Sequence, residues 1–193
     1  MASVEISGEK TAAPLLPPPR NGGSAVGDLV FRFLLFASCV AAVVVMVTGK
    51  QSEFVPIIFP PFLVSRDANF NHSPALIYFV AALSVAGLYA AITTIVSFFA
   101  VLKPASYIKL VSHLVIFDVL VLGLMASATG AAGAVAYIGL KGNSHVQWRK
   151  ICDIYDGFCK HIGSSVAVSL FGSVVLTLLI IISVRALSKR IPK

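Results

Sequence analysis

Four long apolar stretches, separated by short polar segments, dominate the chain. They cover residues 29–47, 75–101, 111–138 and 162–184. A helix needs roughly 20 mainly apolar residues to cross the hydrocarbon core of a bilayer, so each stretch is long enough. Strands of a membrane barrel would be about 10 residues long and would alternate polar with apolar positions, which these stretches do not. Since backbone groups in lipid must be satisfied internally, the pattern predicts four transmembrane helices.

The segments that flank this helical region are polar. Residues 1–28 include four prolines between positions 14 and 19, followed by Asn21, Gly22 and Gly23. Proline does not continue a helix and glycine raises the entropic cost of order, so we expect a disordered tail over residues 1–28. The predicted organisation is this tail, a four-helix transmembrane domain over residues 29–184, and a basic tail over residues 185–193.

Composition supports residence in a membrane. The 193 residues are 58% hydrophobic and only 12% charged, whereas a soluble domain is about 45–50% apolar and about 25% charged. A soluble enzyme is therefore excluded, and the net charge of +7 is not concentrated on one face, so nucleic acid is not an expected partner. The second loop and the C-terminal segment contain six basic residues and no acids. By the positive-inside rule this predicts cytosolic termini for an all-α four-helix bundle.

The first loop outside the membrane, residues 49–74, is unusually apolar. Residues 54–64 contain eight apolar side chains interrupted by Pro56, Pro60 and Pro61, a run too short and too often broken to span a bilayer. Two interpretations remain open. The loop packs onto the ends of the helices, or it forms a contact surface for a partner or for lipid.

The sequence Asn71-His72-Ser73 is an acceptor motif for N-glycosylation. It lies very close to the start of the second helix, and Pro74 follows it. Asn71 is therefore a weak candidate for modification.

Two cysteines occur in the second outer loop, Cys152 and Cys159. On the oxidising side of a membrane such a pair is expected to form a disulfide bond. A metal site with His145 or His161 is the alternative, although the spacing differs from that of structural zinc sites. Cys39, inside the first helix, is read as a small buried residue. Three aromatic residues are expected to stabilise the structure of this extracellular loop: Trp148, Tyr155 and Phe158.

Arg32 and Asp118 are the charges that lie well inside predicted spans. Arg32 lies about 6 Å along its helix from Asp28, and Asp118 about 13 Å from Lys109, so both fall in the cytosolic half. An unpaired charge in hydrocarbon costs several kcal/mol, so we expect an intramembrane ion pair. The alternative is that Asp118 is the proton or ion site of a small transporter or channel.

Small residues recur every four positions on two of the helices. On the third helix these are Gly123, Ser127 and Ala131, and also Ala126, Gly130 and Ala134; on the fourth they are Ser165, Ser169, Ser173 and Thr177. Such faces allow close helix packing, within one chain or between copies. No phosphate-binding loop, nucleophile elbow or catalytic carboxylate pair is present, so neither enzymatic activity nor a catalytic, cofactor-binding or metal site is expected.

Several of these features occur together in one family. The chain resembles the plant CASP-like proteins, relatives of the Casparian strip membrane domain proteins and of the MARVEL four-helix proteins. The resemblance covers all four spans. It rests on Arg32 with residues 41–46, Asp118, the small residues 126–136, Tyr137-Ile138-Gly139, Gly142-Asn143, Trp148, Ile151-Cys152 and Phe158-Cys159.

The resemblance implies a multi-pass plasma-membrane scaffold that self-associates and organises a membrane domain. The implied partners are further copies of the chain, other CASP-like proteins, the lipid bilayer and secreted cell-wall enzymes. The first loop, residues 54–64, differs from that of the strip-forming members. The resemblance therefore implies a CASP-like paralogue, and guidance of lignin deposition is not carried over to this chain.

Overall fold

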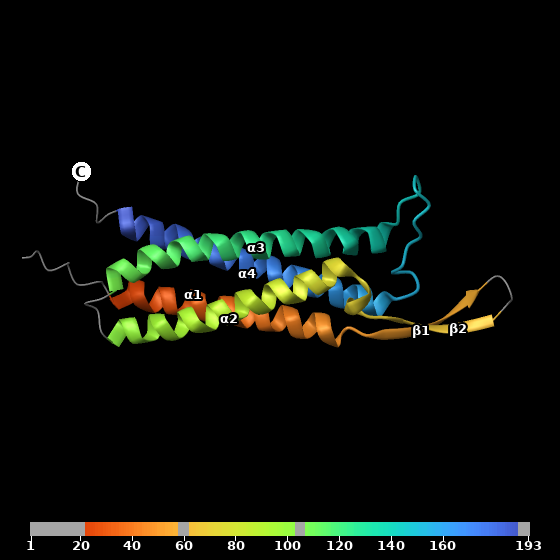
Figure 1. Ribbon diagram of the computed structural model, residues 1–193, viewed down its shortest axis with the longest axis horizontal. Coiled ribbons are helices and arrows are strands. Elements are labelled where there is room, and N and C mark those ends of the chain that lie inside the picture. The colour runs from red at the N-terminus through yellow and green to blue at the C-terminus, as the bar shows by residue number, and fades with distance from the viewer. Residues whose placement is uncertain (1–21, 58–61, 103–106, 189–193) are drawn as a thin grey trace, which may run out of the picture.

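Four long helices lie side by side in alternating directions along most of the molecule (Figure 1). The computed structural model describes residues 22–57, 62–102 and 107–188. Within these residues the helices are α1 (Gly22–Thr48), α2 (Pro74–Leu102), α3 (Tyr107–Lys141) and α4 (Asp156–Ser188). Each is long and apolar enough to cross a membrane. The four-helix transmembrane bundle predicted from the sequence is therefore confirmed.

The start of α1 differs from the prediction. The helix begins at Gly22, whereas the sequence pattern predicts a disordered segment up to residue 28. The last turns before Leu29 remain helical because Asp28 is buried and bonded to the rest of the bundle. Residues 1–21 and 189–193 of the two predicted tails lie outside the described residues.

The buried positions follow the same spacing on every helix. Each helix packs against its neighbours in chain order, and α1 closes the ring against α4. Steps of three and four residues alternate, which is the spacing of a coiled-coil seam. The residues at this spacing are Asp28, Arg32, Leu35, Cys39, Ala42 and Met46 on α1; Leu76, Phe79, Leu83, Ala86, Ala90, Thr93 and Ser97 on α2; Asp118, Val121, Met125, Ala128 and Ala132 on α3; and Phe158, Ile162, Ser165, Ser169, Gly172, Leu176, Leu179 and Ser183 on α4. Ser38, Ala82, Thr129 and Val175 are buried beside them.

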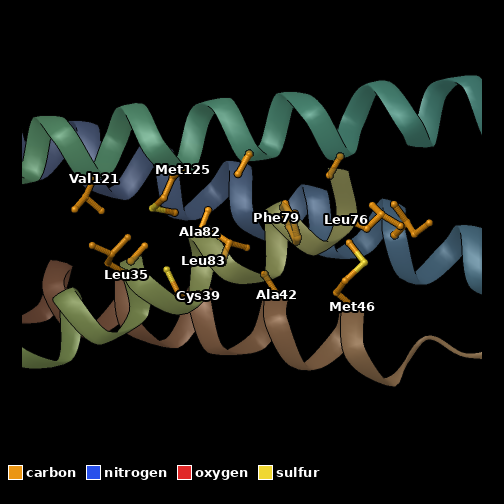
Figure 2. Packing of buried hydrophobic residues seen from close by; sticks show 14 of the residues in the cluster. Leu35, Cys39, Ala42, Met46, Leu76, Phe79, Ala82, Leu83, Val121 and Met125 are labelled. Carbon is orange, nitrogen blue, oxygen red and sulfur yellow. The ribbon is translucent and has the colours of Figure 1, made fainter. Parts of the chain in front are cut away.

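Figure 2 shows the apolar part of this seam. Leu35 and Cys39 of α1 lie opposite Leu83 of α2, and Val121 and Met125 of α3 approach from the other side. All five are buried. The core is therefore continuous across α1, α2 and α3 in this view.

The first loop forms a two-stranded hairpin that was not predicted. Strand β1 (Gln51–Ile57) pairs antiparallel with β2 (Phe62–Ala68), with Gln51 opposite Ala68 and Ile57 opposite Phe62. The 3-10 helix η1 (Phe70–His72) then leads into α2. The hairpin projects away from the helix ends (Figure 1), and Phe54 is 70% exposed. Paired backbone groups in the hairpin satisfy each other. The side chains of residues 55–64, on which the choice between the two interpretations of this loop depends, lie outside the described residues.

The start of α1 and the end of α4 lie at one end of the bundle, called here the terminal end (Figure 1). The hairpin and the loop between α3 and α4 lie at the opposite end, called the hairpin end. Pro74 opens α2 at the hairpin end, where its missing N–H leaves no intrahelical bond unmade.

Candidate functional site

Charged side chains meet in the interior of the bundle near the terminal end. Arg32 is 2% exposed and Asp118 is fully buried. The Nη1 and Nη2 atoms of Arg32 donate to Oδ1 and Oδ2 of Asp118 at 3.3 and 3.2 Å. Because α1 and α3 are diagonal rather than adjacent in the ring, this bidentate pair crosses the centre of the bundle. The long arginine side chain is what makes the crossing possible.

Three further residues complete this polar cluster. The Nε atom of Arg32 donates to Oδ2 of Asp28 at 3.3 Å, and the same oxygen accepts from Oγ of Ser97 at 3.0 Å. The hydroxyl of Tyr89 donates to Oδ1 of Asp118 at 2.7 Å. Tyr89 and Ser97 belong to α2, so one hydrogen-bonded cluster joins three of the helices.

The electrostatics of the cluster follow from its composition. Two carboxylates face one guanidinium, and Arg32 directs its donors to both. A lone charge in hydrocarbon is costly, and bidentate charge-assisted hydrogen bonds offset that cost. Such a closed arrangement fixes the position of α1 relative to α3. The cluster therefore holds the helices together, and it contains one more carboxylate than guanidinium.

The sequence identified the two ends of this pair but not the rest of the cluster. Asp28 was assigned to the predicted tail, although its i,i+4 spacing to Arg32 is a signal for a helical ion pair. Tyr89, Thr93 and Ser97 also recur every four residues on α2. That polar stripe on an otherwise apolar helix is the signal that could have located the remaining partners.

The loop between α3 and α4 is a compact structure at the hairpin end. Cys152 and Cys159 form a disulfide bond, which confirms the predicted pairing. The backbone N–H groups of Ile151 and Cys152 both donate to the carbonyl of Gly139, at 2.9 and 3.1 Å. Gly142 has a φ of +66°, a conformation that favours glycine, and it ends α3 so that the chain can turn back. The loop is thus attached to both helices that it connects.

This loop also anchors the base of the hairpin. The hydroxyl of Tyr155 donates to the carbonyl of Arg66 at 3.1 Å, and the backbone N–H of Phe158 donates to Oε1 of Gln51 at 2.9 Å. Tyr155 and Phe158 are both 9% exposed. Two of the three aromatic residues expected to stabilise the loop are therefore buried against the rest of the hairpin end.

The remaining candidates lie at the surface or in the core. Trp148 is 56% exposed, and its backbone forms a bridge with Asn143. Asn71 is exposed within η1. Cys39 is 1% exposed in the core. Among the described residues no cluster of three metal-ligating side chains occurs.

The two sets of small residues have different surroundings. On α4, Ser165 and Ser169 face inward: Oγ of Ser165 donates to the carbonyl of Ala42 at 2.6 Å, and Ser169 bonds to Thr129 of α3 at 3.0 Å. Ser173 is half-buried and Thr177 is exposed. On α3, Gly130 and its neighbours at four-residue spacing, Ala126 and Ala134, are exposed on the outer surface of the bundle. Ser165 and Ser169 therefore pack the bundle, whereas Ala126, Gly130 and Ala134 face outward.

Comparison with known proteins gives a consistent result. Residues 21–175 match the Casparian strip membrane protein domain. A CASP-like protein 1D1 of Populus trichocarpa is 54% identical over 181 residues, which cover 94% of this chain and 92% of that protein. A CASP-like protein 1D1 of Glycine max is 50% identical over the whole of both chains, and CASP-like protein IN26 of Ipomoea nil is 56% identical over 87% of this chain and 88% of its own. No solved structure matches the chain.

Proposed function

This chain belongs to the Casparian strip membrane protein domain family, and on that premise we propose that it is a plasma-membrane scaffold. In this proposal the protein self-associates, organises a membrane domain and has no enzymatic activity. It is a multi-pass membrane protein with four spanning helices. The proposal concerns what those helices do together.

We assign the terminal end to the cytosol and the hairpin end to the outside. Two observations support this orientation. The disulfide bond between Cys152 and Cys159 lies at the hairpin end, and such bonds persist on the oxidising side of a membrane. The second loop and the C-terminal segment of the sequence are basic. The helices that precede them, α2 and α4, both end at the terminal end, in agreement with the positive-inside rule.

One observation carries the scaffold role. The polar side chains of the buried cluster bind one another inside the bundle, while the outward surface of α3 presents Ala126, Gly130 and Ala134. Small residues at this spacing let a second helix approach closely. The interior thus supports a fixed shape, and the exterior offers a surface on which copies can pack.

The partners follow from this surface and from the family. We propose homo-oligomers and hetero-oligomers with other CASP-like proteins, embedded in the bilayer. The hairpin end, with its exposed Phe54, would meet secreted cell-wall enzymes and link the membrane domain to local modification of the wall.

Lateral mobility and crosslinking together test the scaffold. A fluorescent fusion of the full chain at the cell surface should recover slowly and incompletely after photobleaching. A membrane-permeant crosslinker should capture species larger than one copy. A freely diffusing monomer would overturn the proposal.

A pair of matched variants tests the surface on α3. A Cβ at Gly130 would meet nothing within 4 Å, so Gly130→Leu leaves the fold of one copy intact while blocking close approach of another. Ser84→Leu places the same side chain on the exposed face of α2 and serves as control. We expect fewer crosslinked oligomers with Gly130→Leu and no change with Ser84→Leu. Equal crosslinking of both variants would show that α3 is not the contact surface between copies.

A small transporter or channel is the second candidate function. It is favoured by the excess carboxylate in the buried cluster, where Asp28 and Asp118 share one guanidinium. Flux of protons or ions in reconstituted vesicles, lost in Asp118→Asn, would support it. Vesicles that show no flux above that of empty liposomes would exclude it.

A further inference from the structure

The turn that follows α3, residues 141–150, carries positive charges and no acid; it is called here the basic turn. Lys141 ends α3, and Arg149 and Lys150 end the turn; all three side chains are exposed. Within the part of the chain that the structure describes, none of them forms a salt bridge, and the exposed Asp153 pairs with none of them. Like charges that share a small surface attract an anion jointly.

Backbone contacts bring the two ends of the basic turn together. Asn143 and Trp148 exchange N–H···O=C hydrogen bonds of 3.0 and 2.9 Å. A Cβ at Gly142 would lie 2.6 Å from the carbonyl oxygen of Trp148 and 3.4 Å from Cγ of Lys150. The side chain of Lys150 therefore starts beside position 142, next to Lys141 in the chain. The positive charges from the two ends of the turn share one surface.

The turn is held in a fixed conformation. The backbone of Gln147 is left-handed, with a φ of 57°, which is uncommon for a residue other than glycine. The bonds between Asn143 and Trp148 hold it there, together with a bond of 3.1 Å from the N–H of His145 to Oδ1 of Asn143. Because the turn is already ordered, a ligand would lose little affinity to its ordering.

Trp148 adds an aromatic surface to these charges. Its side chain is 56% exposed, and Arg149 and Lys150 follow it directly. The face of a sugar ring carries C–H groups that stack on an aromatic ring, and the carboxylate of a uronic acid accepts charge-assisted hydrogen bonds from arginine and lysine. An acidic peptide would supply the carboxylates without the flat C–H face. The combination therefore favours an acidic carbohydrate.

The height of the turn above the membrane favours a ligand from water over a lipid. The chain leaves α1 at Gly49, before the exposed Lys50, and a Cβ at Gly49 would lie 2.6 Å from Cβ of His161. From this level α4 extends about 7–8 Å further out to its start at Asp156, and the basic turn lies still further out (Figure 1). The headgroup layer of one leaflet is only about 5–8 Å thick. The turn is therefore beyond the lipid headgroups.

We propose that the basic turn binds a short acidic carbohydrate, an oligomer of uronic acids, outside the cell. The ring of Trp148 packs against the face of one sugar, and the three positive side chains bind the carboxylates. The inference rests on the orientation assigned above, which places the turn outside, and it does not depend on self-association.

Tryptophan fluorescence tests the binding directly, because Trp148 is the only tryptophan of the chain. The full chain in phosphatidylcholine nanodiscs is titrated with an oligomer of galacturonic acid, without divalent cations. We expect a saturable change in the emission of Trp148. A neutral glucose oligomer of the same length should cause none. An unchanged emission with the acidic oligomer would overturn the proposal.

Two further titrations separate carbohydrate from the other anions. Polyglutamate of the same number of charges should bind about tenfold more weakly than the uronic acid oligomer, because it has no ring face for Trp148. Equal binding of both would show that the turn recognises charge alone. Nanodiscs that contain phosphatidylserine should bind the oligomer as before. If this lipid itself changes the emission and prevents binding, the turn is a site for lipid headgroups and the proposal is wrong.

Matched pairs of charge variants locate the site. Arg149→Gln with Lys150→Gln should lower the affinity for a fluorescein-labelled oligomer about tenfold, measured by anisotropy. Lys50→Gln with Arg66→Gln removes the same charge from exposed positions at the hairpin end and should lower it less than twofold. The carbonyl of Arg66, which accepts from Tyr155, is kept. Equal losses in the two pairs would reveal attraction by overall charge and overturn the site.

The stacking contact has its own control in the same turn. Trp148→Ala keeps the backbone bridge to Asn143 and should lower the affinity about fivefold in the anisotropy measurement. Val146→Ala, at a position that is 49% exposed, should bind like the unchanged chain. A Trp148→Ala protein with unchanged affinity would contradict the assigned contact with a sugar face.

A cysteine reporter separates this inference from the proposed orientation. Ser144→Cys, at an exposed position of the turn, should react with a membrane-impermeant maleimide on intact cells. Labelling on cells without binding in nanodiscs would overturn this inference alone. Binding in nanodiscs without labelling on cells would overturn the orientation, and with it the location of the ligand outside the cell.

Discussion

Arg32 binds two carboxylates, one on its own helix and one on α3, and the two contacts should differ in how much they stabilise the fold. Its Nη atoms engage Asp118 on α3, and its Nε engages Asp28 one turn earlier on α1. Asp118 is fully buried, while Asp28 is 8% exposed and lies nearer the helix end. The contact with Asp118 connects two helices and should therefore contribute more to stability than the contact within α1.

Removing Asp118 should be severely destabilising. In Asp118→Ala, Arg32 loses two hydrogen bonds and Tyr89 loses its acceptor on the carboxylate. Breaking a buried pair costs about 3–5 kcal/mol in the free energy of unfolding. We expect retention of a fluorescent fusion before the cell surface and a lower unfolding temperature in detergent.

The control for this variant is Asp156→Ala. Asp156 pairs with Lys160 at the surface, at 2.6 Å, with both side chains more than two-thirds exposed. Exposed pairs of this kind contribute about 0–1 kcal/mol, so surface delivery should be unchanged. Delivery of Asp118→Ala at the level of this control would show that Arg32 does not depend on its partner.

At the scale of the helices, close packing of α1 on α4 depends on the absence of a side chain at position 172. A Cβ there would lie 2.5 Å from Oγ of Ser38 and 3.3 Å from Cε of Met125. Gly172→Ala should lower the free energy of unfolding by about 1–3 kcal/mol, as for overpacked cores. Thermal unfolding in detergent measures the change.

The double variant isolates the cause. Ser38→Ala removes the atom that a new Cβ would meet first, so Gly172→Ala with Ser38→Ala should recover most of the loss. Gly123→Ala, where nothing lies within 4 Å, should be neutral or slightly stabilising because alanine favours a helix. If Gly172→Ala behaves like Gly123→Ala, the helices are not as close as described.

The disulfide bond at the start of α4 should respond to reductant. Closing so short a loop contributes about 2–3 kcal/mol in the chain-entropy model. Reductant should lower the unfolding temperature of the unchanged chain and shift its mobility on gels, and both effects should vanish in Cys152→Ser. Cys39→Ala should keep the reductant response, since Cys39 is a buried free thiol. A chain that is insensitive to reductant would contradict the bond's contribution.

The helices were predictable from the sequence, but their inward faces were not. Bilayer thickness requires long apolar runs, so the four spans are visible directly. In lipid, however, outward positions are as apolar as inward ones. Leu83 is buried on α2 while Leu88 is 65% exposed, and composition does not distinguish them. Only polar or small residues at the inward spacing, such as Ser165 and Ser169, mark the seam.

The hairpin could not be predicted for a different reason. Its strands contain Pro56 and an apolar run without regular alternation, so the period of a strand is absent. The Pro60-Pro61 pair is a turn signal, but it is not of the Asn-Gly type that marks a two-residue hairpin. The pairing between Cys152 and Cys159 was predictable because it is local. The contacts of Tyr155 with Arg66 and of Gln51 with Phe158 were not predictable, because the two partners lie 89 and 107 residues apart in the chain.

For the whole molecule, the bundle and the distal hairpin should be separable. Glu53 lies opposite Arg66 in the register, so an Asn-Gly turn can replace residues 54–65 and close a shorter hairpin. The anchoring contacts of Gln51 and Arg66 remain. We expect an unchanged unfolding temperature and normal surface delivery.

The control for this deletion is Gln51→Ala. It keeps the full hairpin but removes the acceptor for the N–H of Phe158, so it should lower stability by about 0.5–1.5 kcal/mol. A shortened protein that unfolds earlier than Gln51→Ala would show that the distal strands support the bundle.

The length of the hairpin has a geometric consequence for any assembly of this protein. Seven-residue strands rise about 23 Å at about 3.3 Å per residue. In a dense array, neighbouring hairpins would form a layer of that thickness above the lipid. Large polymers would be stopped at the outer edge of this layer, while small solutes would still pass between the hairpins. The same fold would then act as a spacer that sets a minimum gap between the membrane and whatever is built beyond it.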